Sequence, residues 1–184
     1  GTSNIFIAGN FSNSSVAGSI TTSGAGAPNG TITFNGTGTQ ILMIPTSGAA
    51  IWTKYIVNAA STVQLASTLT LSSANVATQA IFVGELTING TFNFGTYQIT
   101  KSGGVSGDAK VSLNSGATLL TANPNGIDGA VSSTNIDRTF SIGANYVFNG
   151  TTSQITRLGM PSTINNLTIT NNSAFPLTTQ TAIT

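Results

Sequence analysis

Residues 85–100 read ELTINGTFNFGTYQIT. Apolar side chains alternate with small polar ones in short bursts, and only one or two turn residues separate one burst from the next. An alternation with a period of two residues predicts β-strands that bury one face. Bursts this close together are difficult to fold as hairpins throughout, but they fit strands that are joined by corners around a coil.

The same pattern recurs along the rest of the chain. Apolar residues two positions apart occur at Ile5 and Ile7, Ile32 and Phe34, Val63 and Leu65, Leu69 and Leu71, Leu86 and Ile88, Phe92 and Phe94, Val111 and Leu113, and Leu167 and Ile169. Asn-Gly dipeptides at 29–30, 35–36, 89–90, 125–126 and 149–150 predict tight turns, because glycine adopts positive φ readily. No segment has a convincing helical pattern, so the chain is predicted to be all-β.

The composition leaves few residues for catalysis, metal binding or thiol chemistry. Thr, Ser, Asn and Gly make up 92 of the 184 residues, and the chain has 5 Lys and Arg, 4 Asp and Glu, and no His or Cys. Proton transfer, metal binding and thiol chemistry all need residues that are scarce here, so we expect no enzyme activity, catalytic residue, metal or cofactor. The basic residues are scattered, which argues against nucleic-acid binding, and no apolar run approaches the roughly 20 residues that insertion into a membrane requires.

Internal repetition is the most informative feature of the sequence. Residues 32–41, ITFNGTGTQI, match residues 146–155, YVFNGTTSQI, and the match extends over residues 32–71 and 146–183. In its second part, residues 52–65 overlay residues 164–177. The alignment predicts buried repeat positions at Phe34, Phe148, Ile164, Leu167 and Ile169. It also predicts that Asn35 and Asn149 close equivalent turns with their side-chain amides.

The repeat implies a module of some 113 residues. Residues 1–184 are therefore predicted to form one continuous repeat segment, with both ends falling inside copies of a longer array. Two architectures fit a module of this size: a right-handed parallel β-solenoid (β-helix), or tandem β-sandwich modules of the immunoglobulin type. The short corners favour the solenoid, with coils of roughly 23 residues.

Several motifs resemble the repeat regions of very large secreted surface proteins of the Bacteroidota, adhesin-like chains that the type IX secretion system exports. The motifs are FNGTGTQ (34–40), LTINGTFNFGTYQIT (86–100), RTFSIG (138–143) and INNLTITNNS (164–173). The resemblance implies a β-helical or otherwise all-β stalk in a secreted adhesin at the outer cell surface. Roles in surface attachment, gliding or filament formation would follow.

Two groups of residues are candidate sites. Trp52, Lys54 and Tyr55 form the most ligand-like cluster, since an aromatic ring beside a cation can stack on a sugar. The repeat argues against it, because Trp52 and Tyr55 align with hydrophobic positions and only Lys54 is then expected to point outward. Asp128 and Asp137 could in principle serve a glycosidase or bind calcium, but no other acidic residues lie near them in the sequence. A loop ion pair between Asp137 and Arg138, or a solvated turn, is the simpler interpretation.

Three functions remain as hypotheses. The preferred one is a non-catalytic structural or adhesive stalk or filament segment of a large exported cell-surface protein. The alternatives are a carbohydrate- or surface-binding module that uses flat ladders of Thr and Asn and, in third place, a solenoid enzyme that degrades polysaccharides. The expected partners are other repeats of the parent chain, with lateral self-association or surface glycans as further candidates. With nine formal charges, stability and any self-association are expected to vary little between low and moderate ionic strength.

Overall fold

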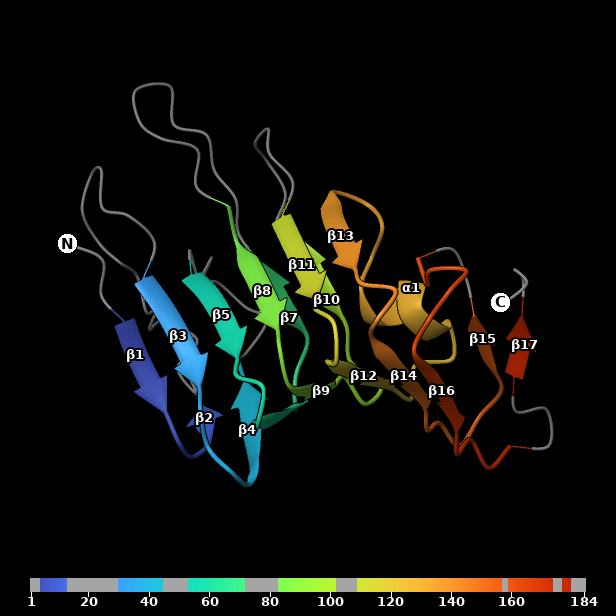
Figure 1. Cartoon of the computed structure of the whole chain (residues 1–184), viewed down its shortest axis with the longest axis horizontal. Coiled ribbons are helices and arrows are strands. Elements are labelled where there is room, and N and C mark those ends of the chain that lie inside the picture. The colour runs from blue at the N-terminus through green and yellow to red at the C-terminus, as the bar shows by residue number, and fades with distance from the viewer. Residues whose placement is uncertain are drawn as a thin grey trace.

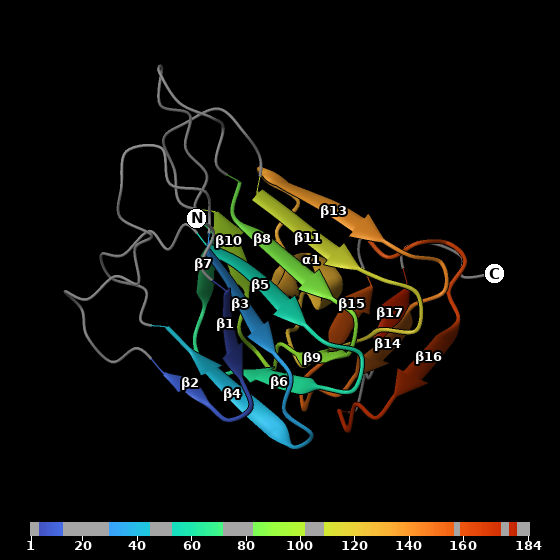
Figure 2. The same ribbon diagram turned by 60° about the vertical axis from the view of Figure 1, so that its left-hand side comes forward.

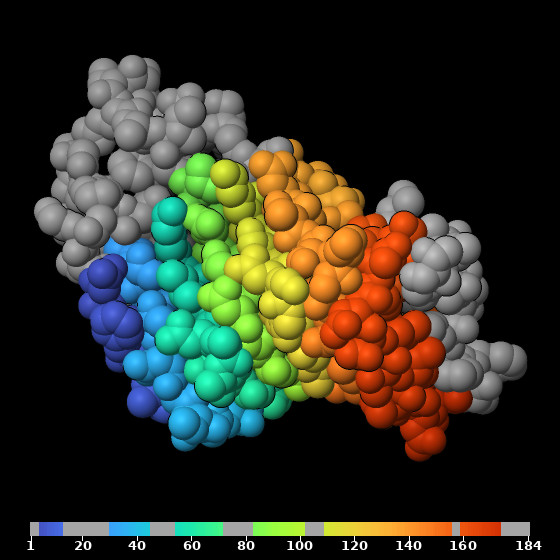
Figure 3. Space-filling model, viewed as in Figure 1, coloured from blue at the N-terminus to red at the C-terminus, as the bar shows by residue number. Residues whose placement is uncertain are grey.

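The chain folds as a parallel β-solenoid, which confirms the all-β prediction and the choice of a solenoid over tandem sandwiches. The computed structural model describes residues 4–12, 30–44, 53–71, 83–101, 109–156, 159–173 and 177–179. The strands stack one after another along the long axis, with β1 near one end and β17 near the other (Figure 1). The colour bands in Figure 3 follow sequence order along the same axis, so each coil packs mainly on its neighbours in sequence.

Two long parallel sheets form the walls of the solenoid. Sheet A contains β1 (Asn4–Ile7), β3 (Gly30–Phe34), β5 (Thr53–Val57), β8 (Glu85–Ile88), β11 (Ala109–Leu113) and β13 (Ile136–Phe140), in this spatial order. Sheet B contains β2 (Phe11–Ser12), β4 (Thr39–Met43), β6 (Thr62–Leu65), β9 (Thr91–Asn93), β12 (Thr118–Thr121), β14 (Asn145–Phe148) and β16 (Asn166–Ile169). Figure 2 shows the strands of sheet A running side by side in one direction.

A third face closes the solenoid in shorter pieces. It contains the pair β7 (Leu69–Leu71) and β10 (Ile99–Lys101), a bridge from Ile99 to Val131, and the pair β15 (Gln154–Thr156) and β17 (Leu177–Thr179). Between the two pairs lies a single-turn helix, α1 (Gly126–Ala130). The prediction of no helix is therefore wrong at this position. Ile127 and Ala130 of α1 are buried three residues apart on one face of the helix, a spacing that five residues are too few to reveal as a periodic pattern.

The core consists of the inward-facing residues of successive coils. In sheet A the buried residues alternate with outward ones and stack in two rows: Ile32, Tyr55, Leu86 and Val111 in the first, and Phe34, Val57, Ile88 and Leu113 in the second. Most coils are longer than the predicted 23 residues, and their lengths vary. The register steps by 23 residues from Thr31 to Lys54 but by 31 from Lys54 to Glu85, because the segments outside the strands differ in length.

Each corner from sheet A to sheet B packs closely on the corner of the preceding coil. The backbone N–H of Asn35 donates to the carbonyl of Ile7, and that of Asn58 donates to the carbonyl of Phe34. At Gly36, an added Cβ would lie 2.3 Å from the carbonyl oxygen of Ala8. Among the Asn-Gly glycines that the structure describes, only Gly126 has positive φ, at 60°. The predicted reason for glycine is thus wrong at Gly36, where close approach of two backbones requires it instead.

The two copies of the internal repeat lie on different faces of the solenoid. The first copy pairs β3 with β5 in sheet A, and the second pairs β14 with β16 in sheet B. The register is the same in both, with Ile32 opposite Tyr55 in the first and Tyr146 opposite Leu167 in the second. The second copy is therefore shifted along the solenoid axis and also lies on the next face, in sheet B instead of sheet A.

A buried glutamine closes the turn in both copies. Gln40 accepts a hydrogen bond from the N–H of Gly36 (2.9 Å), and Gln154 accepts one from the N–H of Gly150 (2.8 Å). The Gln40 amide also donates to two carbonyls of the preceding coil, those of Ile7 and Gly9, at 2.7 and 2.9 Å. The prediction that the asparagine amide closes the turn is wrong, since the glutamine four residues after the glycine does so.

The side-chain amide of Gln154 makes equivalent hydrogen bonds in the second copy. Its amide donates to the carbonyls of Thr121 and Asn123 in the preceding coil, at 2.9 and 3.2 Å. These acceptors lie 33 and 31 residues back in the sequence, the same separations as for Gln40. Each glutamine side chain is thus hydrogen-bonded both to its own turn and to the corner of the preceding coil.

Replacing Gln40 by Leu is expected to lower the free energy of unfolding by about 1–3 kcal/mol, because the N–H of Gly36 loses its acceptor and the carbonyls of Ile7 and Gly9 each lose a donor inside the protein. Gln154→Leu should cost a similar amount. Urea unfolding followed by circular dichroism measures both. The matched control is Gln64→Leu on the exposed face of β6, which should change stability by less than about 0.5 kcal/mol. A loss no larger at Gln40 than at Gln64 would contradict the role assigned to the buried glutamines.

Candidate functional site

The aromatic and cationic cluster of Trp52, Lys54 and Tyr55 does not assemble into a site in the residues that the structure describes. Trp52 lies outside those residues. Tyr55 is fully buried in the row between Ile32 and Leu86, so its assignment as a ligand-binding residue is wrong. Lys54 points to the opposite side of β5, where its Nζ lies 2.8 Å from a carboxylate oxygen of Glu85. Successive residues of a strand face opposite sides, which separates the cation from the ring.

The hydroxyl groups of Tyr55 and Tyr146 are buried and have no hydrogen-bond partner among the described residues. Burial raises the pKa of both phenols well above the ordinary value, because the phenolate would lose its hydration. Both rings are therefore neutral core residues across the physiological range, and each has one unsatisfied polar atom.

Replacing Tyr55 or Tyr146 by Phe is expected to raise the free energy of unfolding by about 1 kcal/mol, because each change removes a buried hydroxyl without a partner. The unfolded chain releases phenolic protons near pH 10, whereas the folded chain retains them, so stability falls as the pH rises above about 10. The double variant should lose less stability there, as thermal melts between about pH 8 and 11 can measure. Tyr97→Phe, on a ring that is 40% exposed, is the control. A destabilising Tyr55→Phe change would contradict the prediction.

The five residues that the repeat predicts to be in the core differ in how deeply they are buried. Phe34 and Phe148 are fully buried, and Ile164 and Leu167 are partly buried against the core. Ile169 is 46% exposed, so its assignment as a core residue is wrong. It lies on β16, the outermost strand of sheet B in the described part of the chain, and no further described strand of that sheet covers it.

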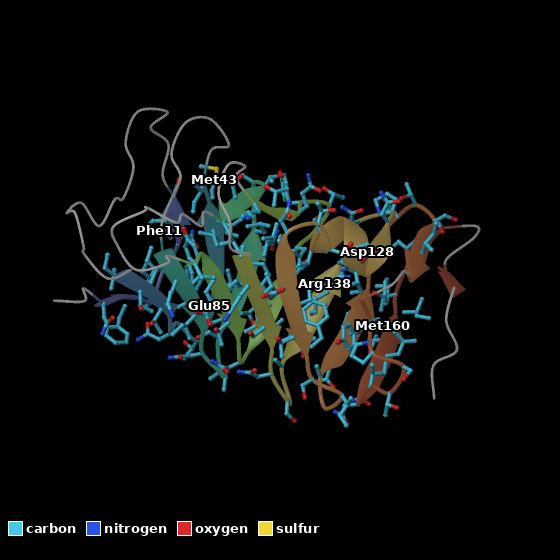
Figure 4. All side chains as sticks on the ribbon, turned by 90° about the horizontal axis from the view of Figure 1, so that it is seen from above. Phe11, Met43, Glu85, Asp128, Arg138 and Met160 are labelled. Carbon is cyan, nitrogen blue, oxygen red and sulfur yellow. The ribbon has the colours of Figure 1, made fainter. Side chains whose placement is uncertain are left out.

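The two candidate carboxylates, Asp128 and Asp137, are held on different sides of the solenoid wall. Asp137 is exposed on the outer face of β13. The next residue, Arg138, lies opposite Val111 in the inward row and forms an ion pair with Asp128 of α1 (Figure 4). The predicted pair between Asp137 and Arg138 is therefore wrong, because adjacent residues of a strand point to opposite faces. Asp128 and Asp137 do not converge on a common site.

Arg138 is the charged member of an otherwise apolar inward row. Its guanidinium also donates to the carbonyl of Val131, at 3.1 Å. At Gly159, with φ of 124°, an added Cβ would lie within 2.4–2.8 Å of three guanidinium atoms, so the chain passes directly over the ion pair. The side chains of Arg138 and Asp128 remain only 13% and 23% exposed. The ion pair between Arg138 and Asp128 therefore connects α1 to β13 of sheet A.

A row of alternating charges on the outer face of sheet A escaped sequence analysis. Lys54, Glu85, Lys110 and Asp137 occupy one register position on β5, β8, β11 and β13. We name these four residues the charge row. Their separations in sequence are 31, 25 and 27 residues, so only the strand register brings them together. Lys54 and Lys110 lie two strands apart in this row, with Glu85 between them, so they form no basic cluster.

A second row, on the outer face of sheet B, consists of uncharged polar residues. It contains Thr39, Thr62, Thr91, Thr118, Asn145 and Asn166. At its end, the amide of Asn145 donates to the hydroxyl of Thr118 (3.4 Å), and the amide of Asn166 donates to the carbonyl oxygen of the Asn145 side chain (2.9 Å). The ladder of Thr and Asn that the surface-binding hypothesis requires is thus present as a geometric feature.

The chain matches no known protein family, curated protein or solved structure. Within the described residues, no three His, Cys, Asp or Glu side chains are grouped to hold a metal ion. In the same part of the chain, no helix is long and apolar enough to cross a membrane.

Proposed function

We propose that this chain is a non-catalytic stalk segment of a large exported cell-surface protein. The observation that carries the proposal is the uninterrupted parallel ladder of sheet B, which runs through seven strands from β2 to β16. Sheet A supports it with a second ladder of six strands. Each strand from β3 to β11 in sheet A and from β4 to β14 in sheet B is thus hydrogen-bonded to a neighbour on both sides, which suits a stiff spacer.

The outer surface supports the same role. Outward positions of the two sheets hold mainly Thr, Ser and Asn, and the charged residues of sheet A face partners of opposite sign on neighbouring strands. Together with the resemblance to repeats of secreted adhesins, this favours a segment that holds a binding tip away from an outer membrane. Neighbouring repeats of the parent chain would be its partners at the two ends.

The spacer proposal predicts a length effect in cells that express the parent protein. Six steps of about 4.8 Å between the seven strands of sheet B make the segment about 3 nm long. Ten additional copies inserted in frame should move an immunogold label on the far side outward by about 30 nm in electron micrographs of intact cells. Label that appears only in lysed cells, or an unchanged distance, would contradict the proposal.

A carbohydrate-binding module is the second candidate, and the Thr and Asn row of sheet B is the observation that favours it. A glycan array with the purified chain separates the two functions. A stalk should show no saturable binding, whereas a binding module should bind and should lose binding on Thr62→Val and Thr91→Val, which keep the shape of the side chain. A parallel screen for polysaccharide hydrolysis or lyase activity tests the enzyme hypothesis. Turnover that is abolished by Asp137→Asn, or by Asp128→Asn in a variant whose circular dichroism spectrum is unchanged, would establish it.

A further inference from the structure

The order of signs in the charge row makes sheet A complementary to itself. Read from β5 to β13, the row is positive, negative, positive, negative, and read in the opposite direction it is negative, positive, negative, positive. Neighbouring members lie about 4.8 Å apart along the solenoid, the spacing of paired strands. A row of this kind opposes unlike charges at all four positions when it meets a second copy of itself that runs the other way.

The geometry of that encounter is specific. A two-fold axis parallel to the strands, placed between β8 and β11, brings Lys54 of one copy opposite Asp137 of the other and Glu85 opposite Lys110. Two copies that run in the same direction without an offset would instead oppose each charge with itself, which costs free energy. Electrostatics therefore selects the antiparallel arrangement from the two symmetric face-to-face pairings.

We propose that two copies of this chain associate laterally, sheet A against sheet A, with their solenoid axes antiparallel. The side chains that carry the charges are accessible for this purpose, since Lys54 is 45% exposed and Lys110 and Asp137 are exposed. Glu85 retains 25% exposure beside Lys54. Such an interface is isologous, so it closes at two copies.

The size of the face sets the strength of the pairing. Six strands spaced about 4.8 Å apart, each about five residues long at about 3.3 Å per residue, offer about 400 Å² per copy. This area is at the low end for specific interfaces and belongs to the weak, transient class. Many segments arrayed along two parent chains would strengthen the contact by avidity.

The antiparallel polarity has a consequence that rests on the proposed function. Stalks anchored in one membrane run outward in the same direction, whereas stalks that reach out from two facing cells run in opposite directions. The pairing therefore fits contacts between cells rather than bundling on one cell. The dimer itself requires no particular location, and a spacer requires no dimer, so the solution test below and the length test above can fail independently.

The first measurement is sedimentation equilibrium of the purified chain from about 10 µM to 1 mM at low salt, a range that detects a weak dimer. We expect a mass that rises from 18.6 kDa toward twice that value, and a return to the monomer in about 1 M salt, where the Debye length is about 3 Å. A monomer at every concentration in low salt would overturn the proposal, as would a dimer that salt does not affect.

A four-fold charge swap tests the geometry. The variant Lys54→Glu, Glu85→Lys, Lys110→Glu and Asp137→Lys keeps the alternation along its own sheet, so circular dichroism should show an unchanged fold, and it should form its own dimer. Antiparallel pairs of variant and wild type would oppose like charges at all four positions. Fluorescence energy transfer between labelled chains should therefore show mixed pairs at least about tenfold weaker than either pure pair.

The control is Gln64→Glu on the outer face of sheet B, which should pair with wild type as wild type does. Mixed pairs of swapped and wild-type chains that form as readily as pure pairs, or more readily, would overturn the antiparallel arrangement. Preferential mixing would indicate copies that run in the same direction, because unlike charges would then be opposed in register.

Discussion

Truncation of Phe34 to Ala is expected to lower the free energy of unfolding by about 3–5 kcal/mol, and Phe148→Ala should cost about the same. Both rings are fully buried, and each occupies the last position of its strand, directly before an Asn-Gly corner that a glutamine closes. Urea unfolding of each variant measures the two losses. Phe6→Ala is the matched control, because Phe6 is 66% exposed on β1 and its removal opens no cavity.

The two phenylalanine losses should also be additive in the double variant, within about 0.5 kcal/mol. Phe34 lies in sheet A and Phe148 in sheet B, with the coils of β5, β8 and β11 between them along the solenoid. They share no direct partner. A loss below about 1 kcal/mol at either position, or strong coupling between them, would contradict the view that equivalent core positions recur on different faces.

Replacement of Arg138 by Met is expected to cost about 3 kcal/mol, because it leaves the carboxylate of Asp128 partly buried without its cation. The carbonyl of Val131 loses a donor at the same time. Asp128→Asn should be destabilising for the converse reason, since the guanidinium then lacks its anion. Thermal and urea unfolding measure the effect.

The double variant Arg138→Met, Asp128→Leu removes both charges. It therefore separates the destabilisation caused by one unpaired buried charge from the net stabilisation that the ion pair provides. Its loss should be smaller than the sum of the two single losses, because neither charge is left alone. Lys54→Met, which removes the more exposed cation of the two pairs (45% against 13% for Arg138), should change stability less than Arg138→Met does. Equal losses at Lys54 and Arg138 would contradict the assignment of Arg138 to the interior.

The alternation of apolar and small polar residues was sufficient to predict the strands and their buried faces. Pairs such as Leu86 and Ile88, or Val111 and Leu113, lie two residues apart and are fully buried. Side-chain direction in a strand is a local property, so a local pattern reveals it. The short corners then allowed a coil to be preferred over hairpins. The single-turn helix α1 was missed, because five residues carry too little of a period to be recognised.

The partners of each side chain depended on the register between coils. The 23-residue step from Thr31 to Lys54 and the 31-residue step from Lys54 to Glu85 differ, and nothing in the local pattern specifies them. The register assembles the charge row and directs Arg138 toward Asp128, although Asp137 is its neighbour in the chain. The sequence by itself therefore determined an all-β coil with a uniform core. Only the tertiary structure decided which charges meet, because contacts between coils join residues that lie about one coil apart in the sequence.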